Sequence, residues 1–431
     1  EAMKFLMSAV IALGVAAPAG ARDVVAEDSH GITVAVMQGN SAALERIGKS
    51  NTTARLAARA GYHRTRGEIA QSNRWADTCI ADAAVVAEKS QGVMYLCRSL
   101  RAGNRLLEGD IAGWAADMQK VRALYQQHVA PSLRAGEEVS GITAPAFESF
   151  SQWPRSATLA APPPAGTRLP LSAKAGVPVI RGKIRGGQDG KQRDIDSDFI
   201  IDTGATRSHI SRKAAQAMGL AVTDDFATDN SRPGQTVAIG LAAPVDVQLG
   251  DLHFSNVAFT VTDQIEFNII GLDLLYRLGP LVLRPTELEL LKTLPTDTCR
   301  QPLATTSALW GGQYSLRLPM RIGKRDELVL LDTGTDVALE ASGVNLSTYP
   351  QASLVQRRRW TMHGLQPVRY AEATAPVTFN GRTVTLQTQV SDQPANVFPI
   401  SWRVGFGLRD DYDYYVDVAG GHGCLAPRTA R

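Results

Sequence analysis

Residues 199–204 read Phe-Ile-Ile-Asp-Thr-Gly, and residues 329–334 read Val-Leu-Leu-Asp-Thr-Gly. In both copies an apolar run that is typical of a buried strand ends in Asp-Thr-Gly. About seventy residues after each motif, the chain returns to an apolar segment that contains glycine. These later segments are Asn268–Asp273 and Val404–Arg409. The repeat predicts two similar β-rich units, each of which presents one carboxylate at a turn beyond a strand.

The similarity between the two copies extends into the residues that separate these motifs. In the first copy Ala243–Val245 precedes an expected strand at Val257–Thr262, and in the second Ala375–Val377 precedes an expected strand at Val384–Val390. Both expected strands come before the glycine-containing segment of their own copy. The shared order predicts a duplicated β-lobe.

This duplication would bring two carboxylates together if the lobes pack about a pseudo-twofold axis. Asp202 and Asp332 would then face each other and share one proton, because like charges at that distance cannot both ionise. The threonines of the two motifs would cross-bond the lobes through their hydroxyls, and the glycines would allow close approach of another backbone. Such a pair can activate a water molecule and protonate the tetrahedral intermediate of amide hydrolysis. This chemistry requires no metal, cofactor or covalent nucleophile.

Residues 177–424 resemble a pepsin-like aspartic protease built from two retropepsin-type lobes in one chain. The motif at Asp202–Ala205 with Ile269–Leu272 is similar to bacterial retropepsin-like lobes, and Asp332–Thr335 with Phe406–Leu408 is similar to the second lobe of pepsins. The resemblance implies a bilobal β-barrel fold and catalysis by Asp202 and Asp332. The residues that would support this pair complete the two motifs: Thr203, Gly204, Thr333, Gly334 and Thr335. It also implies a peptide or protein substrate and activity as a monomer, since one chain holds both carboxylates.

Two residues depart from the pepsin pattern beside the motifs. Ala205 stands where many pepsins carry a serine that hydrogen-bonds the ionised aspartate. Losing that bond should raise the pKa of the pair and move activity toward mildly acidic or neutral pH. Asp336 adds a third carboxylate, which either raises the pKa of the pair further or points to solvent.

Ala205, His209 and Trp360 are the candidates for contact with substrate, and Arg207 is expected near the cleft as well. His209 either confers pH sensitivity or makes a structural hydrogen bond. Trp360 either touches substrate or caps a surface strand. The hairpins that would close over substrate are expected at residues 229–236 in the first lobe and 360–364 in the second.

Ahead of the lobes, the chain has a helical pattern that is rich in Ala, Leu, Arg and Gln. The expected helices are Ser41–Arg59, Thr65–Lys89, Gln91–Leu107 and Ile111–Val129. Residues 106–114 resemble the turn of a tetratricopeptide-type helical repeat; a plain helical bundle is the alternative.

The predicted fold class is therefore multidomain, a helical hairpin bundle (α) followed by an all-β bilobal part. The expected segments are a signal peptide at 1–21 with two leading extra residues, a helical domain at 22–135, a Pro/Ala-rich linker at 136–176, a first lobe at 177–295 and a second lobe at 296–431.

The N-terminal segment predicts export. Lys4 precedes an apolar stretch from Phe5 to Ala17, and Ala19–Ala21 forms a small-residue cleavage site. The short Ala-rich signal is typical of bacteria and places the protein in the periplasm or outside the cell. An even number of cysteines agrees with an oxidising compartment. Four cysteines allow three connectivities, of which pairing within the predicted domains favours Cys79–Cys97 with Cys299–Cys424.

The overall composition is that of an ordinary globular protein. Hydrophobic residues make up 44% and charged residues 20% of the 431 residues, with a formal net charge of +3. So small a charge does not indicate a nucleic-acid partner. No stretch after the signal is long enough to span a membrane, and the scattered histidines do not indicate a metal site.

These observations leave two function classes. The first is an exported, selective aspartic endopeptidase whose helical domain recognises or regulates a partner, a substrate or its own cleft. The second is a catalytically silent or latent peptide-binding scaffold whose helical domain mediates assembly. A zymogen, in which the helical domain or the linker occupies the cleft, would cut itself between residues 136 and 176 at acidic pH.

Overall fold

The computed structural model describes residues 24–87, 91–133, 139–153, 157–161, 163–187, 192–232, 235–263, 265–299, 302–343, 353–361, 364–391 and 402–428. The expected signal peptide lies outside these residues. The chain forms two compact units. A helical unit comprises the residues up to Ser156 together with Asp225–Asp229 and Thr305–Tyr314, and a β unit comprises the rest. The predicted class, a helical part followed by an all-β part, is confirmed.

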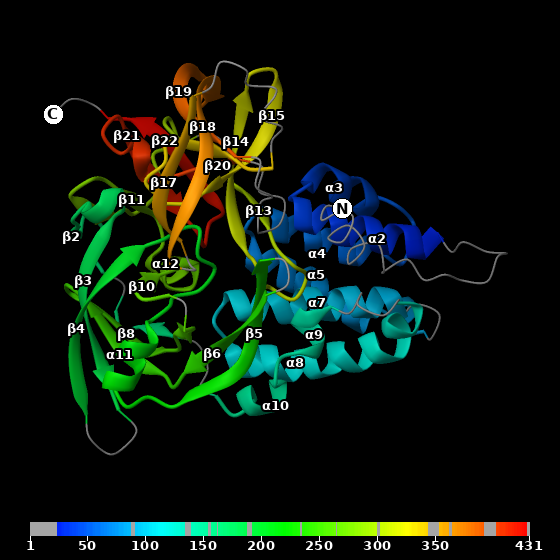
Figure 1. Cartoon of the computed structure of the whole chain (residues 1–431). Helices are drawn as coiled ribbons and strands as arrows, with labels where there is room; N and C mark the ends of the chain where they lie inside the picture. Colours follow the sequence, from blue (N-terminus) through cyan, green and yellow to red (C-terminus); the bar gives the residue numbers. More distant parts are fainter. Residues whose placement is uncertain are drawn as a thin grey trace. The chain divides into compact units, whose positions relative to one another are not determined.

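The helical unit is a series of short antiparallel helices (Figure 1). They are α2 (Val24–Gln38), α3 (Ser41–Gly48), α4 (Arg55–Thr65), α5 (Ile69–Ala81), α6 (Ala83–Val86), α7 (Gln91–Leu107) and α8 (Ile111–Leu124). The predicted bounds of α7 are confirmed, and a π-helical turn at Tyr125–Val129 extends α8 to its predicted end. The other two expected helices were too long. The expected helix Ser41–Arg59 is interrupted between Gly48, where α3 ends, and Arg55, where α4 begins, and the expected helix Thr65–Lys89 is interrupted at Asp82, whose side chain accepts N-terminal backbone N–H groups of α6.

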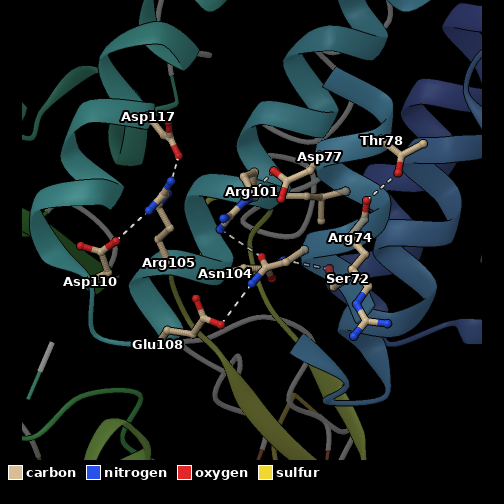
Figure 2. A network of polar contacts seen from close by, with 12 residues as sticks. Ser72, Arg74, Asp77, Thr78, Arg101, Asn104, Arg105, Glu108, Asp110 and Asp117 are labelled. Atoms are coloured by element: carbon tan, nitrogen blue, oxygen red, sulfur yellow. Dashed lines mark hydrogen bonds and ion pairs between the residues drawn. The ribbon is translucent and has the colours of Figure 1, made fainter. Parts of the chain in front are cut away.

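Polar contacts tie α5, α7 and α8 together in the helical unit, as Figure 2 shows. Arg101 on α7 donates to Asp77 on α5 at 2.8 Å, and Asn104 donates to Ser72 at 2.9 Å. One turn further on, Arg105 donates to Asp117 on α8 at 2.7 Å. The predicted disulfide Cys79–Cys97 is confirmed and links α5 to α7. These contacts fix the antiparallel register of the helices.

Two segments from the later part of the chain pack inside the helical unit. Phe226 is 4% exposed, with its ring centroid 5.3 Å from that of Trp114 on α8. The second segment, Thr305–Tyr314, is held by the fully buried Arg64, which donates to Ser307 Oγ and to the Leu309 carbonyl, each at 3.1 Å. Burial lowers the pKa of Arg64 to about 10, and these acceptors satisfy its guanidinium inside the unit.

The segment predicted as a linker carries regular structure over its described residues. Helices α9 (Ser140–Thr143) and α10 (Phe147–Phe150) belong to the helical unit, where both phenylalanines of α10 are fully buried. Strands β1 (Thr158–Leu159) and β2 (Arg168–Pro170) join sheets of the β unit. The prediction of a single linker over residues 136–176 was therefore wrong. Its Pro/Ala-rich composition drew attention away from the few apolar residues that anchor the segment.

The first lobe is built on a six-stranded sheet in the order β1-β8-β7-β3-β4-β10. Its further strands are β3 (Val179–Gly186), β4 (Arg193–Ile201), β7 (Val245–Leu249), β8 (Leu252–Val257) and β10 (Asn268–Ile270). A smaller sheet, β5-β6-β9, contains β5 (Val222–Arg232), β6 (Gln235–Ala242) and β9 (Thr260–Val261). Two helices complete the lobe, α11 (Arg212–Ala217) and α12 (Leu272–Leu278).

The second lobe is built on an eight-stranded sheet in the order β13-β14-β15-β20-β16-β19-β18-β17. The strands are β13 (Ala304–Thr306), β14 (Ser315–Ile322), β15 (Arg325–Leu331), β16 (Leu339–Ala341), β17 (Ser353–Thr361), β18 (Gly364–Phe379), β19 (Arg382–Val390) and β20 (Trp402–Val404). A 3₁₀ turn at Phe406–Leu408 occupies the place that α12 has in the first lobe.

A five-stranded sheet joins the two lobes (Figure 1). Its order is β2-β12-β11-β21-β22, with β11 (Leu281–Leu283), β12 (Glu287–Leu290), β21 (Tyr412–Asp417) and β22 (His422–Pro427). Strand β11 pairs with β21 so that Val282 lies opposite Tyr415. The predicted disulfide Cys299–Cys424 is confirmed and links Cys299 to β22 of this sheet. The lobes are thus hydrogen-bonded into one β unit.

No helix among the described residues is long and apolar enough to span a membrane.

Candidate active site

Asp202 follows directly on β4 and is fixed by β10. The two strands run parallel with Ile200 opposite Ile269, and the Asp202 backbone N–H donates to the Ile270 carbonyl at 3.0 Å. The chain then turns back, so that the Leu272 N–H donates to the Ala205 carbonyl at 2.9 Å. Within this turn the Gly204 N–H donates to Asp202 Oδ1 at 2.8 Å. The glycine-containing segment predicted to support the carboxylate therefore does so through backbone bonds.

Asp332 has the same surroundings in the second lobe. It follows β15, which runs parallel to β20, and its N–H donates to the Val404 carbonyl at 2.9 Å. The Phe406 N–H donates to the Thr335 carbonyl at 2.7 Å, and the Gly334 N–H donates to Asp332 Oδ1 at 3.1 Å. Each of these bonds has its counterpart in the first lobe. The two motifs are structurally equivalent, as the sequence repeat predicted.

Thr203 and Thr333 cross-bond the lobes at the base of the two turns. The Thr203 hydroxyl donates to the Leu331 carbonyl at 2.8 Å, and the Thr333 hydroxyl donates to the Ile201 carbonyl at 2.6 Å. Each hydroxyl also accepts the backbone N–H of the opposite threonine, both at 3.1 Å. Both threonines are fully buried. This symmetrical network holds the two aspartates at a fixed separation.

The glycines of the two motifs leave room for the opposite carboxyl group. A Cβ atom added to Gly204 would lie 2.6 Å from Cγ of Asp332, and one added to Gly334 would collide with the carboxyl of Asp202. Neither glycine has a positive φ angle. Glycine is required at both positions by space, and the two aspartates meet across them.

The electrostatic surroundings raise the pKa of Asp202 to about 8. Burial is the main cause, and the neighbouring charge of Asp332 is the next. The N–H groups of Gly204 and Ala205 act in the opposite direction. The pair can therefore hold one proton on Asp202 up to about neutral pH, which gives it one acid and one base together.

A further charged residue, Arg403, lies beside Asp332. Its Nη1 donates to Asp332 Oδ2 at 3.1 Å, and its Nη2 donates to Glu340 Oε2. Neither Arg403 nor Glu340 was among the residues predicted from the sequence. A signal was nevertheless present, because Arg403 lies two residues before Gly405, as Ile269 lies two residues before Gly271.

Residues 191–277 match the family of gag-polyprotein putative aspartyl proteases. The matched segment contains the first Asp-Thr-Gly motif and its glycine-containing partner strand. The resemblance to retropepsin-like aspartic proteases is confirmed over these residues.

Among solved structures, the aspartic proteinase from Irpex lacteus is similar over 62% of this chain and 98% of its own, with 13% identity and a TM-score of 0.40. No curated protein matches the sequence.

The other residues that the sequence indicated near the two Asp-Thr-Gly motifs differ in exposure and in contacts. Ala205 is half-buried in the turn, where its N–H faces Asp202. Asp336 is exposed and lies beside Gly176, and its exposure agrees with the alternative that its carboxylate faces solvent. Arg207 lies 3.8 Å from Asp273, and both side chains are only 10% exposed.

His209 is a structural residue. It is 3% exposed, its backbone bonds Ile269, and its Nδ1 lies 3.3 Å from Thr260 Oγ1. Burial lowers its pKa to about 4, so the imidazole stays neutral at physiological pH. The proposal that His209 contacts substrate is corrected, because it offers almost no surface to a ligand.

Both lobes carry a hairpin where a substrate-covering flap was expected. In the first lobe β5 and β6 are hydrogen-bonded neighbours, and in the second β17 and β18 pair up to Thr361 opposite Gly364. Residues 233–234 and 362–363 lie outside the described residues, as does the side chain of Trp360. Its contact with substrate stays a prediction.

Proposed function

We propose that this protein is an exported aspartic endopeptidase in which Asp202 and Asp332 activate a water molecule. The observation that carries the proposal is the meeting of two carboxyl groups at equivalent turns, cross-bonded by Thr203 and Thr333. The match of the first lobe to putative aspartyl proteases supports the same reading.

The chemistry follows from one shared proton. The ionised Asp332 takes a proton from water as the water oxygen adds to the peptide carbonyl carbon, while Asp202 gives its proton to the carbonyl oxygen. The neutral tetrahedral intermediate then breaks at its C–N bond. Asp332 protonates the leaving nitrogen, and one hydroxyl of the intermediate returns a proton to Asp202. The pair ends in its starting state.

Selective processing is the role we propose for this endopeptidase. Its support is the composition of the helical unit, which includes Asp225–Asp229 from β5, a strand of the expected flap hairpin. Phe226 anchors this segment among Trp114 and Phe150, and the Ala146 N–H donates to the Asp225 carbonyl at 3.0 Å. Because the helical unit contains part of this strand of the expected flap, it can limit which substrates the flap admits.

Export to the periplasm or the cell exterior completes the proposal. Its support is the N-terminal signal pattern together with two disulfides, which persist in oxidising compartments. Peptide or protein substrates and activity as a monomer are part of the same proposal, because one chain supplies both carboxylates.

The test is cleavage of a diverse peptide mixture by the full chain at pH values from about 3 to 8, the span over which such pairs titrate. Products are read by mass spectrometry, with and without pepstatin. Asp202→Asn and Asp332→Asn should each abolish cleavage. Asp336→Asn is the matched control, because this exposed carboxylate follows the same motif and should leave cleavage intact.

Cleavage that survives both substitutions would overturn the proposal. Peptide binding without cleavage at any pH would favour the scaffold instead. Cleavage that begins only after the chain cuts itself between residues 136 and 176 would indicate a zymogen.

A further inference from the structure

The two lobes differ at one position of the strand that supports each aspartate. In the first lobe Ile269 on β10 lies opposite Ile200, and in the second Arg403 on β20 lies opposite Leu330. Both residues occupy the same register, two residues before the supporting glycine. Ile269 is a 6% exposed apolar residue. The second copy of the repeat thus has a cationic side chain where the first copy has an apolar one, so this position differs between the two carboxylates.

The guanidinium of Arg403 bridges two buried carboxylates. It contacts Asp332 Oδ2 at 3.1 Å and Glu340 Oε2. The Asp332 and Glu340 side chains are 12% and 9% exposed, respectively. Glu340 lies on β16 directly opposite Arg403 in the antiparallel β16–β20 pair. Because backbone pairing fixes Glu340, it orients the guanidinium toward Asp332.

The charges around this group keep Arg403 ionised. Burial alone would lower the pKa of Arg403, but Glu340 and Asp332 together raise it above its ordinary value. Asp202 has a different set of neighbours. The charge that acts on it most is that of Asp332, with which its carboxyl group also forms a hydrogen bond, and the backbone N–H groups of Gly204 and Ala205 donate to it. A cation therefore contacts one member of the pair, and uncharged donors contact the other.

We propose that Arg403 is a positioning residue that keeps Asp332 the ionised member of the pair, so that the shared proton resides on Asp202. The proposal rests on the catalytic role proposed above for the two aspartates. It predicts that the pair keeps one charged and one neutral carboxyl group down to a lower pH than it would without Arg403. Glu340 weakens this effect, because its carboxylate also contacts the guanidinium and offsets part of the positive charge.

The test compares pH profiles of kcat/KM for peptide cleavage. Arg403→Ile gives the second lobe the residue that the first lobe has. It should move the acid limb of the profile to higher pH by about 1–3 units, the usual effect of an adjacent cation on a carboxylate. Arg403→Lys, which keeps the charge, should retain most of the acid limb.

Glu340→Gln provides the opposite change. It leaves the guanidinium to act on Asp332 alone, so the acid limb should move to lower pH. Opposite directions for Arg403→Ile and Glu340→Gln would support the proposal, because a merely structural contact would lower activity without moving the limb. An unmoved limb in Arg403→Ile, or shifts in the same direction, would overturn it.

Two further measurements separate this proposal from its premises. If Arg403→Ile folds poorly because Glu340 loses its contact with the guanidinium, the double variant Arg403→Ile/Glu340→Gln removes both charges and should still move the acid limb to higher pH. If the wild type cleaves no peptide, the carboxyl carbon-13 signals of the pair, assigned with Asp202→Asn and Asp332→Asn, replace activity as the readout. The acidic titration step of the pair should move to higher pH in Arg403→Ile, and identical titrations would overturn the proposal.

Discussion

The first lobe surrounds Asp202 with apolar strand residues and backbone N–H groups, whereas the second lobe places Arg403 and Glu340 beside Asp332. The turns themselves match bond for bond, from the strand that ends at each aspartate to the glycine N–H that donates to its carboxylate. The two equivalent turns can therefore form one pair of carboxyl groups, while the side chains around them give the two members of the pair different roles. Symmetry brings the pair together, and the departure from symmetry decides which carboxyl group holds the proton.

The largest expected effect comes from filling the space between the turns. Gly204→Ala and Gly334→Ala would each push a methyl group into the opposite carboxyl group. A displacement of the reacting groups by about 1 Å costs roughly 100-fold in rate, so kcat/KM should fall by at least that much in both variants. Gly92→Ala is the control, since an added Cβ atom there meets nothing within 4 Å.

An effect in only one of the two glycine variants would break the equivalence of the lobes. Activity measured at a single pH suffices for this comparison, provided that circular dichroism shows both variants to be folded.

The next effect concerns stability as a function of pH, and it should differ between the aspartates. The folded protein retains the Asp202 proton up to a pKa of about 8, whereas the ordinary value for an unfolded chain is 3.8. Between these values the unfolded chain binds fewer protons, so this group makes folding less favourable as pH rises. Asp202→Asn should therefore be similar in stability to the wild type near pH 4 and more stable at pH 8. The difference should grow by about 1.4 kcal/mol for each pH unit between the two pKa values.

Asp332→Asn should behave differently at acidic pH. It removes a carboxylate that accepts a hydrogen bond from Arg403 and leaves this cation with Glu340, so it should destabilise the fold near pH 5. Urea unfolding of both variants at several pH values makes the comparison. The same pH dependence in both would contradict the division of roles between the lobes.

The smallest expected effect is the symmetrical one. Thr203→Val and Thr333→Val each remove a hydroxyl that donates to a carbonyl and accepts an N–H of the other lobe. Each should cost about 1–3 kcal/mol of unfolding free energy, by similar amounts in the two lobes, whereas Thr→Ser at either site should cost little. Equilibrium denaturation measures both, and a marked difference between the lobes would show that the cross-bonding is not equivalent.

The sequence alone predicted the part of the site that the repeat encodes. Asp202 and Asp332 were found because an apolar run followed by Asp-Thr-Gly fixes strand, turn and carboxylate together. Both disulfides followed from pairing the cysteines within each domain. These features are encoded in short or repeated stretches of sequence, so they can be recognised without the structure.

The features that the sequence did not reveal depend on contacts between distant residues. Arg403 lies just before the predicted segment Val404–Arg409, and only strand pairing places it against Asp332 and Glu340. His209 follows the first motif closely, yet packing with Ile269 and Thr260 removes it from the surface. The strands inside the expected linker were hidden for the same reason, since their partners lie far along the chain.

The most direct test of a shared catalytic pair is a double-substitution cycle on the pair itself. We would measure kcat/KM for the wild type, Asp202→Asn, Asp332→Asn and the double variant on one peptide at one pH. If the two carboxyl groups act as one unit, each single substitution should remove nearly all activity, on the order of 10⁴-fold, and the double variant should lose no more. Substantial activity in either single variant, or losses that multiply in the double variant, would contradict a shared catalytic pair.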